Sequence, residues 1–543
     1  MTDQNIETLL GEDGILLARI DMPGRKMNVF SVDLMDSLER LIDRVEGDDR
    51  VVAVVLASGK RAFLAGADLA MIRMFTERAR TDAHAELVQL CGRLGRIFRR
   101  LERSAKPFVA AVDGLALGGG LELCLACHAR VVSDRRGVLL GLPEIKLGLL
   151  PGAGGTQRLP KLVGARLGLE MLLRGEPLDA RAALEHGLVD EIASADRLIE
   201  RARARAKSLG PVLKPWDVEG MSFDGGEFAL EQADGVEARI ASALGLSPDL
   251  LEHYPAYRAI MDCVVQGWSM PMDDALANEM DIFVRLIQDR VAGNMVRALF
   301  LDRQRSLKAL DEVLDAGAVR IGLLGGDGKG LADALAAAGI ELAEPGALTR
   351  GDVAVLIDGR GEAGPATGVA FLREGGPATI DPASGCRAGV WVSARRQHGR
   401  VVEIFGDGDP AVHSVAMSIA RTQMPDGVLV SNGREPLLPQ LAERVRAARA
   451  RGLHEELEVV VVAQGALEAL AAGRLSDEAL LDSAAVLAGL VPAYSGGPFT
   501  SLRQMGEAEA AARLDRARTV AADRGGAESG LGDLFNGAAR HGA

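Results

Sequence analysis

Two glutamates in the first third of the chain, Glu122 and Glu144, could act as a general acid and a general base. Glu122 lies in L-G-G-G-L-E-L-C at 117–124, where three consecutive glycines leave the main chain bare just before the acid. Glu144 lies in G-L-P-E-I-K-L-G-L-L-P-G-A-G-G-T at 141–156, ahead of a second glycine-rich loop. Two carboxylates that converge on an apolar pocket can divide this work, because burial and mutual repulsion separate their pKa values. Either glutamate alone could equally be a helix-end or surface acid.

A third stretch, A-F-L-A-G-A-D-L at 62–69, adds a small-residue turn directly after the apolar run 51–57. The N–H of Ala67 in this turn could point into the same pocket as the glycine corner at 118–120. Glycines admit a ligand to the main chain, and a helix N-terminus presents unpaired N–H groups and partial positive charge. Two such donors on one carbonyl oxygen form an oxyanion hole, in which each donor is typically worth about 2.7–4 kcal/mol. The alternative is a pair of ordinary tight turns.

The elements that must hold these stretches alternate between strands and helices. Apolar runs at 14–20 and 51–57, with helical patterns between them, predict an α/β domain with a buried sheet. Residues 196–310 lose the strand pattern and predict a helical connector. At 319 the run V-R-I-G-L-L-G-G-D-G-K-G predicts a strand, a glycine turn and a helix, the outline of a dinucleotide-binding unit. From about 425 the pattern is helical, and we expect the tail 525–543 to be loose.

The bulk properties exclude several classes of protein. A chain of 543 residues exceeds what one core usually serves, so we expect at least two domains. A net charge of −14 without a long basic stretch argues against nucleic acid as a partner. We expect no membrane span, because every long apolar stretch is interrupted by charge or glycine.

The cysteines and the start of the chain predict a cytoplasmic protein without a metal site. The start, M-T-D-Q-N-I-E-T-L-L, lacks the features of a signal peptide, and five irregularly spaced cysteines fit reduced thiols. The string C-L-A-C-H at 124–128 matches a c-type haem attachment sequence, but its apolar setting favours a packed helix.

Taken together, the stretches at 62–69, 110–123 and 141–160 resemble those of the crotonase, or enoyl-CoA hydratase/isomerase, superfamily. The resemblance implies a spiral ββα crotonase fold over 1–195, completed by the connector 196–315. It implies hydration of a trans-2-enoyl-CoA, with isomerase activity as an addition. The implied catalytic groups are the N–H groups of Ala67 and Gly119 as oxyanion donors and the carboxyls of Glu122 and Glu144, which hold the attacking water. Of the two acids we expect Glu144 to donate the proton and Glu122 to activate the water; the reverse division is the alternative. The implied substrate contacts are Lys26, Asp68, Gly118, Pro151 and Gly152. For Lys26 a solvated loop charge is an equal alternative, and Asp68 could instead be structural.

A longer resemblance is to the multifunctional α-subunit of fatty-acid β-oxidation, which joins a hydratase to an NAD-dependent 3-hydroxyacyl-CoA dehydrogenase. It is carried by A-C-H-A-R-V-V-S-D-R-R at 126–136 and Y-P-A-Y-R-A-I at 254–260, and it weakens after residue 310. It implies a degenerate Rossmann-like domain at 316–424 and a reduced helical domain at 425–543. An oligomer and a thiolase partner are implied as well.

The second half departs from the dehydrogenase pattern where NAD chemistry needs it. In the turn from Gly325 to Gly330, Asp327 replaces the middle glycine and opposes a phosphate by charge and bulk. Counting back from V-E-I at 402–404, Trp391 occupies the place of the basic histidine, and indole has no basic nitrogen. We therefore expect an inactive dehydrogenase half, with coenzyme A as part of the substrate and no further cofactor. The alternatives are a bifunctional enzyme that still uses NAD and a non-catalytic scaffold subunit.

Overall fold

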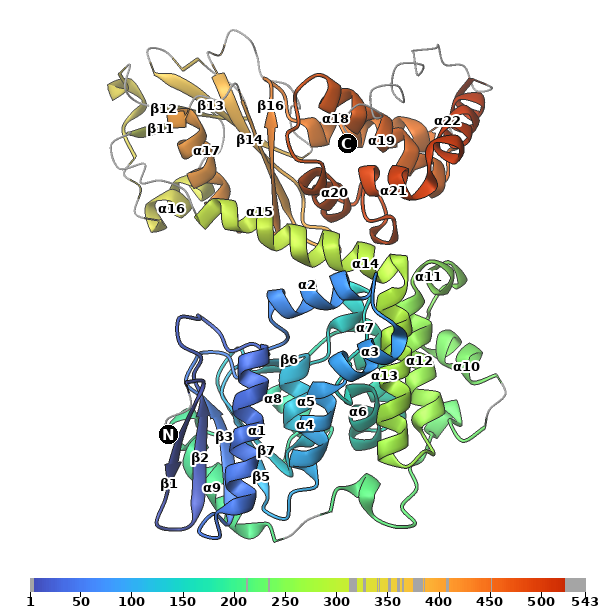
Figure 1. The fold of residues 1–543 in the computed structure, drawn as a ribbon. Helices are drawn as coiled ribbons and strands as arrows, with labels where there is room; N and C mark the ends of the chain where they lie inside the picture. Colours follow the sequence, from blue (N-terminus) through green and yellow to red (C-terminus); the bar gives the residue numbers. More distant parts are fainter. Residues whose placement is uncertain are drawn as a thin grey trace. The chain divides into compact units, whose positions relative to one another are not determined.

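The computed structural model divides the chain into two compact units, Met1–Gly293 and Asn294–Ala543. It describes residues 4–210, 213–232, 235–311, 320–325, 329–338, 340, 342–349, 353–358, 362–363, 366–374, 384, 386–406, 410–450 and 452–522. Each unit combines a sheet of mostly parallel strands with packed helices (Figure 1), so the predicted α/β class is confirmed.

The larger sheet of the first unit contains both apolar runs that predicted strands. Its order is β1 (Ile6–Leu10), β2 (Ile15–Ile20), β3 (Ala53–Ser58), β5 (Phe108–Val112), β7 (Ala129–Ser133) and β10 (Glu191–Ala193). Only the β1–β2 pair is antiparallel. The strands from β3 to β7 are buried on both faces, which explains their continuous apolar sequences.

A smaller sheet brings the three glycine-rich stretches together. It consists of β4 (Leu64–Ala65), β6 (Leu115–Leu117), β8 (Leu139–Gly141) and β9 (Leu178–Asp179). The first three are parallel, with Leu64 opposite Ala116 and Leu117 opposite Gly141. Each ends where one of the stretches begins its turn. Because carboxyl ends of parallel strands share one edge of a sheet, three turns distant in sequence meet there.

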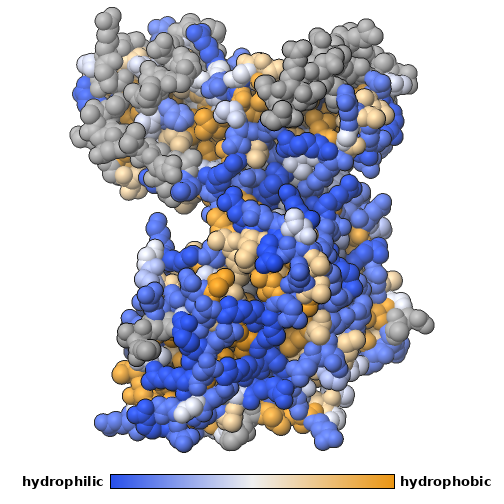
Figure 2. Space-filling view, viewed as in Figure 1, coloured by the Kyte–Doolittle hydropathy of each residue, from blue (hydrophilic) through white to orange (hydrophobic). Residues whose placement is uncertain are grey.

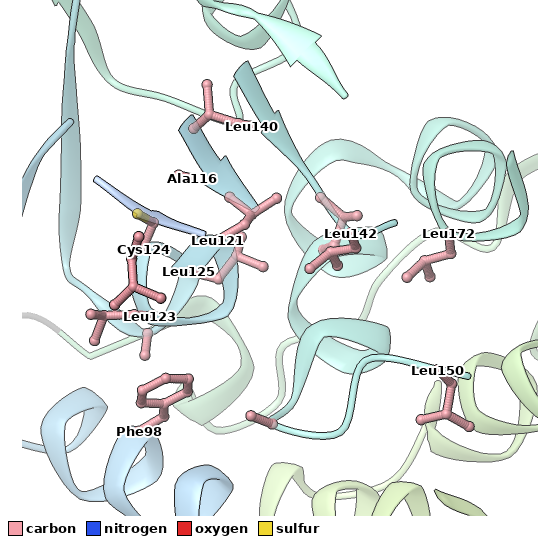
Figure 3. Close-up of a cluster of buried hydrophobic side chains, with 14 of the residues drawn as sticks. Phe98, Ala116, Leu121, Leu123, Cys124, Leu125, Leu140, Leu142, Leu150 and Leu172 are labelled. Atoms are coloured by element: carbon pink, nitrogen blue, oxygen red, sulfur yellow. The ribbon is translucent and has the colours of Figure 1, made fainter. Parts of the chain in front are cut away.

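The helix that follows β6, α5 (Gly119–Ala126), is hydrophobic on all sides, and this character places it in the core. Around the sheets lie α1 (Val32–Gly47), α2 (Leu69–Arg78), α3 (His84–Cys91), α4 (Arg93–Glu102), α5 (Gly119–Ala126), α6 (Gly155–Val163), α7 (Ala165–Arg174), α8 (Ala180–Glu185) and α9 (Leu198–Ser208). Figure 3 shows α5 side chains, among them Leu121 and Cys124, within a cluster that includes Phe98, Leu142 and Leu150. Cys124 and Cys127 are fully buried, so the haem-like string is part of a packed helix.

The region 196–315, predicted as a helical connector, is helical, but its last part belongs to the second unit. It contains α10 (Val236–Leu244), α11 (Pro248–His253), α12 (Pro255–Gly267), α13 (Met272–Gln288), α14 (Arg290–Val296), a π-helical turn (Arg297–Leu301) and α15 (Asp302–Asp311). Arg303 Nε donates to the Asp426 carbonyl at 2.8 Å, and Val428 N–H donates to Ser306 Oγ at 3.1 Å. These contacts place 294–311 with the second unit, so the division falls at Gly293 rather than at residue 315.

The second unit has a six-stranded sheet in sequence order. Its strands are β11 (Ile321–Leu324), β12 (Val353–Ile357), β13 (Thr367–Arg373), β14 (Cys386–Val392), β15 (Val401–Gly406) and β16 (Gly427–Asn432). All neighbours are parallel except β14 and β15. An isolated parallel bridge joins Ile321 to Leu342, so β11 has a neighbour on each side.

The helical part that the sequence predicted from about residue 425 begins later, with α18 at Leu437. Further helices of the second unit are α16 (Lys329–Ala337), α17 (Pro410–Thr422), α18 (Leu437–Ala450), α19 (Glu455–Ala471), α20 (Glu478–Leu487), α21 (Pro498–Met505) and α22 (Glu507–Ala522). Residues 427–432, expected in the helical part, form β16 because they pair with β15 from Val401 onward. The tail 525–543 lies outside the described residues.

Figure 2 shows hydrophilic residues interspersed with smaller hydrophobic patches on the visible face of each unit. Among the described helices, none combines the length and apolarity that crossing a membrane requires.

Candidate active site

Glu122 is held in place by the loop that leads into α6. It lies on the first turn of α5 and is 3% exposed. Its Oε1 accepts hydrogen bonds from Ala153 N and Gly155 N, both at 2.8 Å. Burial raises the pKa of Glu122, while these two N–H donors lower it in part by stabilising the carboxylate. Both donors reach Oε1, and no described protein group donates to Oε2.

The carboxyl of Glu144 has fewer hydrogen-bond donors around it than that of Glu122. It opens a short 3-10 helix, Glu144–Leu147, directly after β8. Its Oε2 is buried and accepts no hydrogen bond from any residue in the described part of the chain. Burial, followed by the negative charge of Glu122, raises the pKa of Glu144 to about 8. A carboxyl oxygen that is buried without a donor favours the neutral form, so Glu144 holds a proton near neutral pH.

The three consecutive glycines each allow a different close approach. Gly118 has φ +56°, and a Cβ there would lie 2.6 Å from Glu144 Oε1. A Cβ at Gly119 would lie 2.8 Å from the Phe30 ring, and one at Gly120 would lie 2.3 Å from the Leu64 carbonyl oxygen. The run G-G-G therefore brings the end of β6 against Glu144 on one side and against β4 on the other.

Two backbone N–H groups at this edge are unpaired. Phe30 N donates to Gly66 O at 2.8 Å and Asp68 N donates to Phe30 O at 2.7 Å, so Ala67 lies between two paired residues. Within the described ranges, neither Ala67 N–H nor Gly119 N–H donates to a protein acceptor. Gly119 is the first residue of α5, where an N–H has no intrahelical partner. The two donors follow the adjacent parallel strands β4 and β6.

Asp68 and Lys26, both predicted as substrate contacts, differ in their surroundings. Asp68 caps α2 by accepting from Ala70 N at 3.0 Å, and it binds Arg25 Nη2 at 2.5 Å. These contacts satisfy its carboxylate and favour the structural interpretation. Lys26 is exposed and has no hydrogen bond or ion pair with another described residue.

Pro151 and Gly152, predicted to line the acyl pocket, lie in the loop before α6. Pro151 is buried, and a Cβ at Gly152 would lie 3.1 Å from the ring of Phe283 on α13. The loop is therefore packed between α13 and the carboxylate of Glu122.

A third buried acid at the site, Glu279, was not predicted. It projects from α13 and is 1% exposed. Its Oε1 accepts from Gly154 N at 2.7 Å, and its Oε2 accepts from Thr156 N at 3.2 Å and from the Thr156 hydroxyl. Burial, followed by the charge of Glu122, raises the pKa of Glu279 to about 8.

One signal in the sequence could have identified Glu279. Ala275 and Phe283, four residues before and after it, are both buried, so Glu279 lies on the apolar stripe of α13. An acid on such a stripe needs a buried partner or a proton.

Two described residues of the second unit, Gly330 and Trp391, differ from what the dinucleotide fingerprint and the hydride-transfer step would use. Gly325 has φ +74°, whereas Asp327 lies outside the described residues. A Cβ at Gly330 would meet nothing within 4 Å, although the third glycine of a dinucleotide fingerprint serves close helix–strand packing. Trp391 is buried in β14, opposite Leu372 on one side and Glu403 on the other, and its indole supplies no base.

Comparison with known proteins supports the crotonase prediction. Residues 11–212 match the family model described as enoyl-CoA hydratase/isomerase. The fatty acid oxidation complex subunit alpha of Shewanella sp. (strain MR-4) is 36% identical over 297 residues, which are 53% of this chain and 40% of the relative. That of Idiomarina loihiensis is 36% identical over 324 residues, 58% of this chain and 44% of the relative. This chain thus spans less than half the length of these relatives.

Among solved structures, DspI of Pseudomonas aeruginosa is 32% identical and covers 39% of this chain and 83% of its own, with a TM-score of 0.34. The family match covers all three glycine-rich stretches, both glutamates and both sheets of the first unit apart from β1. Residues 11–212 of the first unit are therefore similar to the enoyl-CoA hydratase/isomerase family.

Proposed function

We propose that the first unit hydrates 2-enoyl-CoA thioesters and that the second unit carries out no redox step. The observation that carries the proposal is the buried, unpartnered Oε2 of Glu144, because an acid held this way keeps a proton that it can deliver. The description of the matching family, enoyl-CoA hydratase/isomerase, supports the same reaction class, the addition of water to the conjugated double bond.

The substrate carbonyl is assigned to the unpaired N–H groups. The thioester oxygen accepts from Ala67 N–H and Gly119 N–H, which polarises the conjugated double bond and stabilises the enolate. Gly118 and Gly119 leave no side chain between this oxygen and the main chain. Lys26, on the loop before α1, is the proposed contact for a phosphate of coenzyme A.

The two acids divide the proton transfers according to their hydrogen bonds. Glu122 has two N–H donors that stabilise its charged form, so it is the acid better suited to act as the base. It removes a proton from water as the water oxygen bonds to C3, and the electron pair of the double bond moves onto the thioester oxygen. Glu144 then gives its proton to C2 as the enolate collapses. The product is a 3-hydroxyacyl-CoA. Glu122 is left protonated and Glu144 ionised, and proton exchange with solvent restores their starting states.

The same pair of acids supports double-bond isomerisation as a second activity. Moving a double bond from C3 to C2 needs one proton removed at C2 and one returned at C4, with the same enolate between the two steps. The raised pKa of Glu144 suits it to both transfers, since it can take up and release a proton near neutral pH.

The printed names of the relatives extend the proposal to an assembly. They are subunits of a fatty acid oxidation complex, and an oligomer with a thiolase partner in the cytoplasm is the corresponding proposal for this chain. Size measurement of the purified chain with and without a candidate thiolase tests it, and a monomer that binds no thiolase would contradict it.

A panel of 2-enoyl-CoA chain lengths tests the hydratase assignment. Loss of absorbance of the conjugated enoyl thioester is expected for at least one length, with a 3-hydroxyacyl-CoA as the product. The buried Glu403 of the second unit supplies a matched control, because Glu403→Gln also changes a buried acid but lies outside the site. No absorbance change for any length in the folded chain would reject the proposal.

A further inference from the structure

The loop that holds Glu122 is itself held by a second buried acid, through alternate N–H groups. Ala153 and Gly155 donate to Glu122, whereas Gly154 and Thr156 donate to Glu279. Four successive backbone donors thus point alternately to α5 and to α13. A shift of the loop toward one acid lengthens its bonds to the other.

The carbonyl side of the loop is fixed as well. Arg158 is fully buried, and its Nη1 donates to Ala153 O at 2.8 Å. Two bonds, at 2.9 and 3.0 Å, join Arg158 to the buried Glu102 on α4. Gly154 adopts φ +98°, a left-handed conformation that favours glycine and turns its N–H toward Glu279. Without Glu279, the Gly154 N–H has no acceptor among the described side chains.

We propose that Glu279 is a positioning residue for hydration: it fixes Gly154 and Thr156 so that Ala153 and Gly155 present their N–H groups to Glu122. With Oε1 of Glu122 occupied in this way, its Oε2 is the oxygen that receives the proton of water. This inference rests on the proposed function and names a residue that acts through the loop rather than on the substrate.

Glu279 also acts on the site through its charge. The pKa of Glu144 is raised mainly by burial and by Glu122, and the charge of Glu279 adds to this effect. Because the pKa of Glu279 is itself about 8, this charge is present on the alkaline side, where removing it lowers the pKa of Glu144. The titratable groups that face Glu279 from the neighbouring elements are Glu122 on α5, Glu144 after β8, Arg158 on α6 and Cys263 on α12.

The first test compares Glu279→Gln with Glu403→Gln, using the enoyl-CoA that the wild-type chain hydrates fastest. In Glu279→Gln the amide NH₂ faces a backbone donor, so the loop loses an acceptor while the side chain keeps its shape. We expect kcat to fall about 10²-fold, as a small misplacement of a catalytic group costs, with little change in KM. The loss of activity at alkaline pH should begin at a lower pH than in the wild type.

Glu279→Asp separates charge from geometry. It keeps the carboxylate but shortens the side chain, so the alkaline limb should return toward its wild-type position while kcat stays low. Equal rate loss at every pH in Glu279→Gln, without a shift of the limb, would overturn the electrostatic part. An unchanged kcat in Glu279→Gln would overturn the positioning role.

Hydrogen exchange of the segment 150–159 provides a readout that does not need activity. Faster exchange in Glu279→Gln, but not in Glu403→Gln, supports the clamp on the loop. Unchanged exchange in Glu279→Gln overturns it. If the wild-type chain hydrates no enoyl-CoA but the exchange result holds, the proposed function fails and the clamp stands.

Discussion

A buried glutamate in each unit shows what distinguishes a reactive acid from a structural one. Glu403 in the second unit is fully buried, and both its oxygens are occupied. Oε1 accepts from Leu437 N at 2.6 Å and from the Ser431 hydroxyl, while Oε2 accepts from Leu438 N at 2.7 Å. Glu144 in the first unit has a buried oxygen that no described donor reaches. Burial alone therefore does not single out Glu144 as the candidate proton donor; its oxygen without a donor distinguishes it from Glu403.

Two glycines, Gly120 in the first unit and Gly330 in the second, differ in how closely other atoms pack against them. A Cβ at Gly120 would lie 2.3 Å from a backbone oxygen, whereas a Cβ at Gly330 would meet nothing within 4 Å. Both lie in the first turn of a helix, α5 and α16 respectively. The turn of α5 depends on its glycines for packing against neighbouring strands, and that of α16 does not use Gly330 for this purpose.

The largest expected effect is that of Glu144→Gln on turnover. Loss of a proton donor costs about 10²- to 10⁴-fold in rate, and the neutral amide suits the buried site, so the fold should be kept. Glu403→Gln should instead lower stability by about 1–3 kcal/mol, because a satisfied acceptor is lost, with turnover unchanged in the folded protein. Initial rates and circular dichroism of both variants provide the check. Near-normal turnover in Glu144→Gln would contradict the role of Glu144 as the proton donor.

The pH dependence of hydration should follow the raised pKa values. Glu144 must be protonated to act, and its pKa is about 8, so turnover should fall as the pH rises through about 8. Glu122 must be ionised, and its pKa is raised above the usual 4.5, so turnover should also fall on the acidic side at a higher pH than for an exposed glutamate. Because the two acids interact, the profile reports values of the pair. A rate that stays constant well above pH 8 would contradict Glu144 as the proton donor.

The same protonation predicts the direction of the stability change. Between the usual value of 4.5 and about 8, folded Glu144 binds more protons than it does in the unfolded chain. Its contribution to the free energy of unfolding therefore decreases as the pH rises through this window.

A smaller effect is expected from alanine at the two glycines. Gly120→Ala must displace the Leu64 carbonyl, and such overpacking typically costs about 1–3 kcal/mol. Gly330→Ala meets open space within a helix and should be neutral or stabilising by up to about 1 kcal/mol. Thermal unfolding of both variants tests this. If both shift the unfolding temperature equally, packing does not explain the difference between the turns.

The smallest expected effect concerns NAD. Titration of the chain with NADH should give no saturable change in nucleotide fluorescence, because Gly330 and Trp391 lack the features that the fingerprint and the hydride-transfer step require. Saturable binding together with oxidation of a 3-hydroxyacyl-CoA would instead establish a bifunctional enzyme.

The four candidate residues named from the sequence stretches and their family resemblance, Ala67, Gly119, Glu122 and Glu144, lie at one edge of the smaller sheet. They meet there because the three turns follow three parallel strands. Their roles stay a prediction. Glu279 was missed because its partners lie more than 120 residues away, and only packing of α13 brings them together.

Domain limits were predicted less well, for a related reason. The helical pattern continues without interruption across residue 293, and tertiary contacts such as the bonds of Arg303 and Ser306 to 426–428 assign α15 to the second unit. Residues 427–432 form a strand because β15 lies beside them. Both outcomes depend on tertiary neighbours that a local pattern does not contain.

The structure of the first unit with a bound acyl-CoA thioester would test the central claim most directly. The carbonyl oxygen should lie about 2.7–3.1 Å from both Ala67 N and Gly119 N, the distances of a working oxyanion hole, with the Glu144 carboxyl beside C2. A thioester oxygen bonded to neither N–H, or a Glu144 carboxyl turned away from the acyl chain, would contradict the account.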